Sequence, residues 1–483
     1  MDNTPILIGA ANIQQKNSLD KLDEALILMD KAFKLAAKDS SPKITKYIDE
    51  IRVPKGFWKY RDPGAWIAEK NNFLNKPATY VSKIGVLQQN LINEAIKKIM
   101  AGDINASLVI GGESRYKLVQ SLKANKEYKE TKLIQNPDHY LKAQSDLNLP
   151  EEIKELSHMA VGYYAILENA LRHKNKNSVK QHKKIIADLY EGFSEIASQN
   201  KDSLISKKIK SHEISESSKM NPYQAFPYNK YHCTSWNVNQ ASALIICNKR
   251  IADKLEISEA KRIYPLAASE TNYMNPLIQR ESMLNPLGMK LAAKFIIDQL
   301  NKLQKKVDFY DLYSCFPVAV QMFAESLNIK PSKYSTITGG MSFAGGPLNH
   351  YVLTSTVQMI DKLRNKPNSI GLITGVSGVM TKQSYALWSS EKITNFSHKD
   401  VTSQVEKLDI PMLLSHKKSG EAKIVSYTIL KDKKNYKKKA VIYAETKNKK
   451  RLILSSQKKE FIKDMERNEW IGKDINFKNG SLV

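Results

Sequence analysis

The chain has 483 residues, of which 42% are hydrophobic and 8% aromatic, and it carries a formal net charge of +26. This composition excludes extensive disorder, and the length predicts roughly two to four structural units rather than one compact core. No apolar stretch approaches the roughly 18 residues of a membrane span, and the first residues lack the basic region and cleavage site of a signal peptide. Three cysteines are too few for a disulfide framework, so we expect a cytoplasmic protein.

The excess of positive charge is almost all Lys, and it is spread along the whole chain. Proteins that bind nucleic acid specifically usually concentrate Arg and aromatic residues on one element. Nucleic acid is therefore not an expected partner. A basic surface would still attract a polyanionic small ligand.

The first part of the chain alternates predicted strands and helices. Helical spacing of apolar residues predicts the helices, and a continuous apolar run predicts a buried strand. In chain order we expect a strand at 5–11, a helix at 20–38, a strand ending at 53, a short helix capped by Asp62, an extended segment at 79–84, a helix at 86–101 that ends on Gly102, and a buried strand at 107–112.

The same order of glycine-containing loop, helix, apolar strand and glycine recurs near residue 350. A helix is predicted at 351–364 and a strand at 370–375. Between the two copies we expect a strand at 263–268, a helix at 288–304, a strand at 308–313 and a helix at 317–326. The pattern predicts a duplicated α/β structure whose pseudo-twofold brings the helix N-termini of both halves near one central site.

Two segments differ from this pattern. The segment after residue 117 is rich in Lys, Asn and Ser, with helices expected at 154–172 and 179–198. The C-terminal part predicts short strands at 422–430, 440–444 and 451–454, with Lys437–Lys439 in a turn. We therefore divide the chain into a first half (1–116), an insertion (117–231), a return to the first half (232–262), a second half (263–397) and a β-rich C-terminal domain (398–483).

Several motifs, in order, resemble those of thiolases. They are Gly-Gly-Glu-Ser at 111–114, the segment 236–244, Asp-Leu-Tyr-Ser-Cys-Phe at 311–316 and the glycine-rich loop 338–347. They are similar to the sterol carrier protein-type thiolases, and among these to thiolase-like proteins with an additional C-terminal domain, often labelled acetyl-CoA acetyltransferases. The resemblance covers essentially the full length. It implies two βαβαβ-type halves in α/β/α/β/α layers, a helical loop insertion and a small C-terminal OB-like barrel.

The resemblance places the nucleophilic cysteine of a thiolase near Gly85, at a helix N-terminus whose dipole would favour the thiolate. No cysteine lies near this position in the sequence. Ser82 is a conceivable substitute, but a serine without an adjacent base is more typical of a cap or loop residue. The Cys-x-Gly motif also lacks its cysteine, since the chain reads Thr-Gly-Val-Ser-Gly at 374–378. Covalent acyl transfer by the usual route is therefore not expected.

The Gly-His-Pro motif of thiolases carries the histidine that activates the nucleophile. Here Gly346 stands at the position of that histidine, and His350 follows one helical turn later. His350 is either a neutral base, with its pKa lowered by the helix dipole, or a helix-start residue bonded to a neighbouring loop. The residues expected to form the oxyanion and substrate loop are Gly345, Gly346, Asn349 and Gly85.

In the third motif, Cys315 matches the acid/base cysteine of the sterol carrier group, although a buried cysteine is by default a small hydrophobe. Tyr313 replaces the residue that holds the oxyanion-hole water. Thiolase-fold aldolases that act on steroid side-chain CoA esters use a tyrosine at this point, in a Tyr-Asp-x-Phe motif. Here Ser314 replaces the Asp. The alternative role of Tyr313 is packing with one hydrogen bond.

We interpret the chain as a thiolase-like protein that binds acyl-CoA in lipid metabolism, acetyl-CoA acetyltransferase-like if it is an enzyme, with Cys315, His350 and Tyr313 as candidate catalytic residues. The alternatives are a retro-aldolase that uses Tyr313 and a non-catalytic CoA-binding or scaffold protein with a basic tail. Coenzyme A is expected only as part of the substrate, with no tightly bound cofactor and no metal. Arg172 and the segment 227–230 are candidates to bind its phosphates. Many thiolases form homodimers, and this assembly stays open here.

Overall fold

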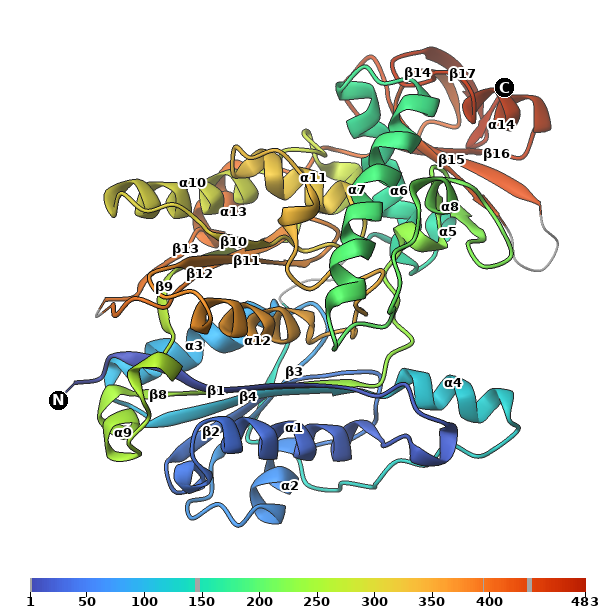
Figure 1. Ribbon diagram of the computed structural model, residues 1–483. Helices are drawn as coiled ribbons and strands as arrows, with labels where there is room; N and C mark the ends of the chain where they lie inside the picture. The colour runs from blue at the N-terminus through green and yellow to red at the C-terminus, as the bar shows by residue number, and fades with distance from the viewer. Residues whose placement is uncertain (1, 144–147, 394, 432–436) are drawn as a thin grey trace.

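The computed structural model describes residues 2–143, 148–393, 395–431 and 437–483. Two sheets face each other across a layer of helices, and a third sheet forms a barrel at the C-terminal end (Figure 1). Among the described residues, no helix has both the length and the apolar character needed to cross a membrane.

The N-terminal half is built on a six-stranded mixed sheet with the order β1-β8-β4-β2-β3-β5. Its strands are β1 (Pro5–Gln14), β2 (Ile48–Pro54), β3 (Ala78–Ser82), β4 (Ala106–Glu113), β5 (His139–Leu141) and β8 (Gln240–Asn248). Its helices are α1 (Ala25–Asp39), α2 (Pro63–Lys70), α3 (Gln88–Ala101) and α9 (Lys249–Lys254). All of β4 is buried, as its continuous apolar run predicted.

The start of α2 and the end of α3 lie where capping residues in the sequence predicted them. Asp62 is the N-cap of α2, and its Oδ1 accepts a hydrogen bond from Ala65 N at 3.0 Å, with Pro63 in the first turn. The helix α3 ends at Gly102, whose φ of 82° is left-handed and suits glycine.

Two predicted helices differ in the structure. The helix expected from residue 20 starts later, at α1. Leu19–Lys21 form a separate 3-10 turn, and the Gln15 side chain accepts a hydrogen bond from Asp23 N in the extended residues that follow this turn. The helix expected at 154–172 is two helices, separated where Ser157 adopts a φ of 60°. Both differences come from contacts or backbone angles that helical periodicity does not encode.

The C-terminal half has a five-stranded sheet with the order β10-β11-β12-β9-β13. Its strands are β9 (Tyr264–Thr271), β10 (Phe309–Asp311), β11 (Ile370–Ser377), β12 (Lys382–Ser389) and β13 (Ser397–Asp400), and its helices are α10 (Leu287–Lys302), α11 (Pro317–Ser326), α12 (Tyr351–Arg364) and α13 (Thr402–Leu408). The bounds of α11 and α12 are those predicted. The strand expected at 308–313 is shorter, because Tyr313 N donates to the Thr374 side chain instead of a neighbouring strand.

The two halves stack into the expected α/β/α/β/α layers (Figure 1). The helices α1 and α2 cover the outer face of the N-terminal sheet, α3 and α12 lie between the two sheets, and α10 and α11 cover the outer face of the second sheet. The central helices are therefore buried on both sides, and α12 is apolar or buried over almost its whole length.

The inserted segment and the C-terminal part meet at one end of the molecule. The insertion contains α4 (Arg115–Lys123), α5 (Pro150–Leu156), α6 (Ala160–Lys174), α7 (Val179–Gln199), α8 (Ser211–Ser215), β6 (Tyr223–Ala225) and β7 (Tyr228–Asn229). The C-terminal part contains β14 (Ser419–Lys431), β15 (Lys438–Glu445), β16 (Arg451–Ser456), α14 (Lys459–Met465), β17 (Asp474–Lys478) and β18 (Ser481–Leu482). Because β14 pairs with both β15 and β17, the strands close into a barrel. Lys438 and Lys439 lie in β15, so their expected place in a turn is wrong, and residues 432–436 lie outside the described part of the chain.

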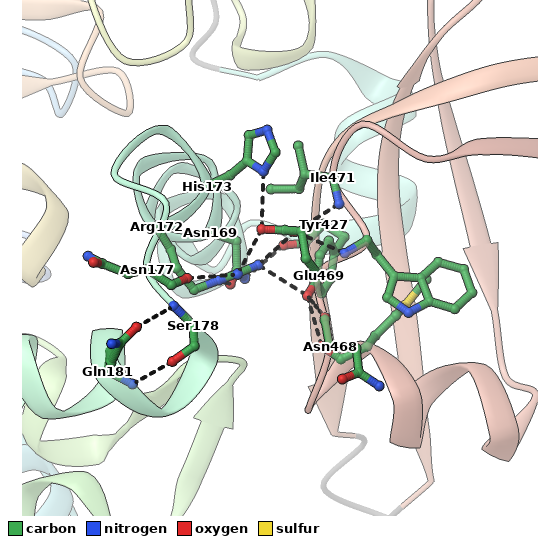
Figure 2. A network of polar contacts seen from close by, with 12 residues as sticks. Asn169, Arg172, His173, Asn177, Ser178, Gln181, Tyr427, Asn468, Glu469 and Ile471 are labelled. Carbon is green, nitrogen blue, oxygen red and sulfur yellow. Dashed lines mark hydrogen bonds and ion pairs between the residues drawn. The ribbon is translucent and has the colours of Figure 1, made fainter.

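A polar network joins the insertion to the barrel (Figure 2). The Arg172 guanidinium of α6 donates to both carboxylate oxygens of Glu469, at 2.9 and 3.0 Å. Asn169 Nδ2, one turn earlier, donates to the backbone oxygen of Tyr427 in β14 at 3.0 Å. The barrel is thus bonded to the helix that also packs over the second half.

Candidate functional site

The N-termini of the two central helices meet, as the duplication predicted. The Gln88 side chain, at the first residue of α3, accepts a hydrogen bond from Val352 N of α12 at 2.7 Å. The site expected from the sequence lies around this junction, between the two sheets. Its residues come from loops at the ends of the strands and from the first turns of the helices.

Gly85 lies in the turn before α3, where the thiolase nucleophile was expected. Its φ is 103°, which requires glycine, and its carbonyl oxygen accepts a hydrogen bond from Lys382 Nζ at 3.2 Å. Ser82 is buried in β3 rather than exposed in this turn. The start of α3 therefore lies beside the Lys382 amino group, where the resemblance to thiolases places a thiol.

Tyr313 follows β10 and points toward the same junction. Its hydroxyl lies near the Gln88 side chain, and its ring packs edge-to-face on Tyr351 with centroids 5.6 Å apart. Burial, more than any neighbouring charge, raises the pKa of this hydroxyl well above its ordinary value. Tyr313 is therefore a neutral hydrogen-bond donor rather than a base.

Cys315 is buried beneath the insertion. The hydroxyl of Tyr164, from α6, lies near its sulfur, and the neighbouring Phe316 stacks on the Tyr164 ring with centroids 4.5 Å apart. Burial raises the pKa of the Cys315 thiol to about 12. The thiol is therefore protonated at neutral pH and is a poor nucleophile.

His350 is the N-cap residue of α12, and its side chain lies against the N-terminal sheet. A Cβ atom at Gly111 of β4 would lie 2.5 Å from His350 Cβ, so this histidine fills the space above that glycine. Its Nε2 has no partner among the described residues, and burial lowers its pKa to about 3. The imidazole is neutral, as one of the two interpretations expected, but no hydrogen bond links it to Cys315 or Tyr313.

The glycine loop is packed against its own chain. Gly345 has a φ of 106°, and Gly346 N donates to Ser235 O at 3.0 Å. A Cβ atom at Gly346 would lie 2.2 Å from Thr234 Cγ2, so the space of the missing histidine side chain is occupied. Asn349 is buried, and its Nδ2 has no hydrogen-bond partner in the described structure.

Asp311, at the end of β10, organises this loop, and the sequence analysis did not single it out. Its carboxylate accepts hydrogen bonds from Ser355 Oγ at 2.6 Å, Thr336 Oγ1 at 2.8 Å and Tyr351 Oη at 3.1 Å. Burial raises its pKa, and these donors act in the opposite direction. Asp311 therefore fixes the start of the glycine loop to α12.

Of the cations proposed for coenzyme A phosphates, Arg172 is buried and bonded to Glu469, as Figure 2 shows. It is a structural residue, and its proposed role in phosphate binding is wrong. Lys230 is exposed. Lys382 was missed, although a single lysine that begins an otherwise uncharged strand is a signal that could have found it. In the described residues, no group of three or more His, Cys, Asp or Glu side chains is arranged to hold a metal ion.

No protein-family model matches the chain, and no curated protein matches it. Among solved structures, a monomeric SCP2-thiolase-like protein type 1 from Mycobacterium smegmatis is 20% identical, with a TM-score of 0.83, and the match covers 100% of this chain and 99% of that chain. The Ltp2-ChsH2(DUF35) aldolase is 12% identical, with a TM-score of 0.58, over 81% of this chain and 99% of that chain.

The Acat5 thiolase from Ascaris suum, in complex with coenzyme A, is 13% identical, with a TM-score of 0.53, over 80% of this chain and 99% of that chain. At these identities the comparisons establish the fold alone. The full-length match includes the C-terminal barrel. The chain therefore has the thiolase fold in the form of the SCP2-thiolase-like proteins.

Proposed function

We propose that the protein binds an acyl-CoA thioester between its two halves and does not form a covalent acyl-cysteine intermediate. The observation that carries this proposal is the junction of α3 and α12, where Gly85 stands in place of the nucleophile and Gln88 ties the two helices together. The fold is that of a thiolase whose structure contains coenzyme A.

The neutral side chains around the junction support non-covalent handling of a thioester. Tyr313 keeps its proton and can donate it as a hydrogen bond to a developing oxyanion. Cys315 is protonated at neutral pH, which disfavours its acting as a replacement nucleophile. Carbon–carbon bond chemistry at the thioester would therefore depend on hydrogen-bond donors rather than on an acyl-enzyme.

The test is a calorimetric titration of the full chain with acetyl-CoA and coenzyme A, together with intact-mass spectrometry after incubation with acetyl-CoA. We expect saturable binding and no added acetyl group. Thiolysis of acetoacetyl-CoA is expected to be at the background rate. Absence of binding at millimolar ligand would overturn the proposal.

A trapped acetyl group would also contradict it. Two matched variants then locate the attachment, because Cys315→Ser removes the thiol at the site and Cys247→Ser removes a buried thiol in β8, in the N-terminal sheet. Loss of the adduct in the first variant only would show that Cys315 is a nucleophile.

A retro-aldolase is the second candidate, favoured by the position of the Tyr313 hydroxyl near the Gln88 side chain at the start of α3. In that reaction a 3-hydroxyacyl thioester loses its hydroxyl proton, its C2–C3 bond breaks, C3 becomes a carbonyl carbon, and C2 receives a proton. Tyr313 would donate that proton or bind the thioester oxygen.

If such a lyase activity is detected, Tyr313→Phe should lower kcat by at least about 100-fold, since general acid catalysis typically contributes that much. Tyr385→Phe is the matched control, because Tyr385 is also buried but bonds Ser326 under α11. Equal activity of the two variants would exclude Tyr313 as the acid.

A further inference from the structure

We propose that Lys382 and the start of α3 bind a carboxylate group, so that the preferred ligand is an acyl thioester whose acyl group ends in a carboxylate. This inference rests on the proposed function and names the substrate class of the same site. It depends on three features of the described structure: an unpaired buried ammonium, an uncapped helix N-terminus and a constrained hairpin.

The Lys382 side chain is buried without a counter-ion. The residue is 2% exposed, and its Nζ donates one hydrogen bond, to Gly85 O at 3.2 Å. In the described chain, no carboxylate lies within ion-pair distance of Nζ, and burial alone lowers its pKa. An ammonium group has three N–H donors, so most of its capacity is unused.

Glu270 is the acidic residue that the strand register brings nearest along this face. It lies opposite Ser384, two residues beyond Lys382 in β12, so both point to the same side of the sheet. Its carboxylate accepts a hydrogen bond from Asn93 Nδ2 at 2.7 Å. The described part of the chain therefore supplies no anion to Lys382, and a buried unpaired charge is costly unless a ligand pairs with it.

The helix α3 has the positive end of its dipole at its N-terminus, which follows the turn that Lys382 contacts. The helix α3 has 14 residues, its N-cap is Leu87, and no side chain caps it. Its first backbone N–H groups have no acceptor within the helix, and the macrodipole favours an anion at this end. A carboxylate bound at this helix start would accept hydrogen bonds from the Lys382 amino group and from free amides of the first turn.

The hairpin that carries Lys382 is held in an unfavourable backbone conformation. Val379 and Met380 have φ values of 54° and 61°, which are rare for such side chains. The buried Arg280 guanidinium donates to Val379 O at 2.7 Å and to Gly378 O at 3.1 Å, which fixes the turn. Strain of this kind persists only where surrounding contacts impose it, and here it sets the position of Lys382.

These features suit Lys382 as a binding group for a carboxylate better than as a nucleophile that attacks the thioester carbonyl carbon. Attack of the Lys382 amine on a thioester would expel the CoA thiol and leave a stable amide, which ends the reaction. A carboxylate instead accepts hydrogen bonds from the ammonium and the helix amides without a chemical change. Lys382 is therefore assigned as a binding residue.

The experiment compares malonyl-CoA, acetyl-CoA and free malonate as ligands of the full-length chain by calorimetry. We expect malonyl-CoA to bind at least about tenfold more tightly than acetyl-CoA, since a charge-assisted hydrogen bond contributes that much. Lys382→Met should reduce this ratio to about one, and Lys382→Arg should retain part of it.

Lys399→Met is the matched control, because Lys399 is an exposed lysine in β13 of the same sheet and its loss changes the net charge equally. It should leave the ratio unchanged. Equal affinity of the wild-type chain for the two thioesters, or a ratio that Lys382→Met does not alter, would overturn the inference. A melting curve for each variant excludes unfolding as the cause.

The two proposals fail in different ways. If neither thioester binds but malonate stabilises the wild-type chain and not Lys382→Met, the carboxylate site stands as a site for a free acid and the acyl-CoA function fails. If both thioesters bind equally in every variant, the function stands and the carboxylate site is wrong.

Discussion

At the scale of single residues, burial sets the protonation of the candidate site. It is the largest cause of the shifted pKa values of Tyr313, Cys315 and His350, and each of these groups is held in its neutral form. Thiolase chemistry needs the opposite for its nucleophile, which is a thiolate at a helix N-terminus. The titratable group that this chain places beside the start of α3 is instead Lys382, whose pKa burial lowers.

The burial of His350 predicts acid sensitivity. The folded chain keeps His350 neutral down to a pKa of about 3, whereas the unfolded chain takes up a proton near the ordinary value of 6.5. The unfolded state then binds more protons, so the free energy of unfolding falls as the pH decreases from 6.5 toward 3 and is fully retained above 6.5.

The variant His350→Gln should reduce the slope of unfolding free energy against pH in that window by up to about 1.4 kcal/mol per pH unit. Urea titrations at several pH values measure the slope. His416→Gln, at an exposed histidine, is the control and should leave it unchanged. An unaltered slope in His350→Gln would show that the imidazole is not buried in this form.

The second residue-scale prediction concerns the position of the missing thiolase histidine. Gly346→His should destabilise the fold by about 1–3 kcal/mol. Its Cβ atom alone would lie 2.2 Å from Thr234 Cγ2, so the new side chain would not fit without a shift of its neighbours. The double variant with Thr234→Ala should recover part of the loss, since the two sites are in contact. Additive effects in a thermodynamic cycle would contradict this packing.

At the scale of elements, the edges of the N-terminal sheet are covered by the chain itself. The strand β5 pairs in parallel with β3 from Tyr80 opposite His139 to Ser82 opposite Leu141. At the other edge, Leu7 of β1 forms a bridge with Ile263. Because exposed edges are what allow sheets of two molecules to join, the three-residue β5 is a short template for a partner, and the bridge at Leu7 interrupts the free edge of β1.

We therefore predict a monomer rather than the homodimer that many thiolases form. Light scattering after gel filtration should give the mass of one chain, 54.8 kDa, at micromolar concentration. Pro substitution at Tyr140, within β5, should uncover the edge of β3 and increase self-association. A dimeric wild-type chain would show that another surface forms the interface.

At the scale of the whole molecule, the insertion and the barrel are coupled to the thiolase halves through α6. Arg172 is buried, whereas its partner Glu469 is partly exposed, so removing the carboxylate would leave a buried guanidinium unpaired. Loss of one partner of such a pair is destabilising even where the intact pair contributes little.

Glu469→Gln should therefore lower the free energy of unfolding by about 2–4 kcal/mol, measured by denaturant titration. Glu421→Gln is the control, because Glu421 pairs with Lys447 on the exposed surface of the barrel, where solvent screens the pair and its loss should change stability little. If the two variants unfold alike, the network of Figure 2 does not couple the barrel to the insertion.

The sequence by itself determined the layered fold and the missing thiols. Helical periodicity predicted α12 with its observed bounds, the continuous apolar run predicted the fully buried β4, and the absence of cysteine near Gly85 follows from residue identity alone. These features are local, since each depends on the spacing or identity of neighbouring residues.

Only the tertiary structure decided the chemistry of the site. Several pairs of residues that meet in the structure are far apart in the sequence, and no local pattern indicates which residues will meet. These pairs are Lys382 and Gly85, Gly346 and Thr234, and Arg172 and Glu469. The protonation of Cys315 and His350 likewise follows from desolvation by distant segments. Burial and pairing are properties of the packed chain, and for that reason the motifs predicted where a site should lie but not the state of its groups.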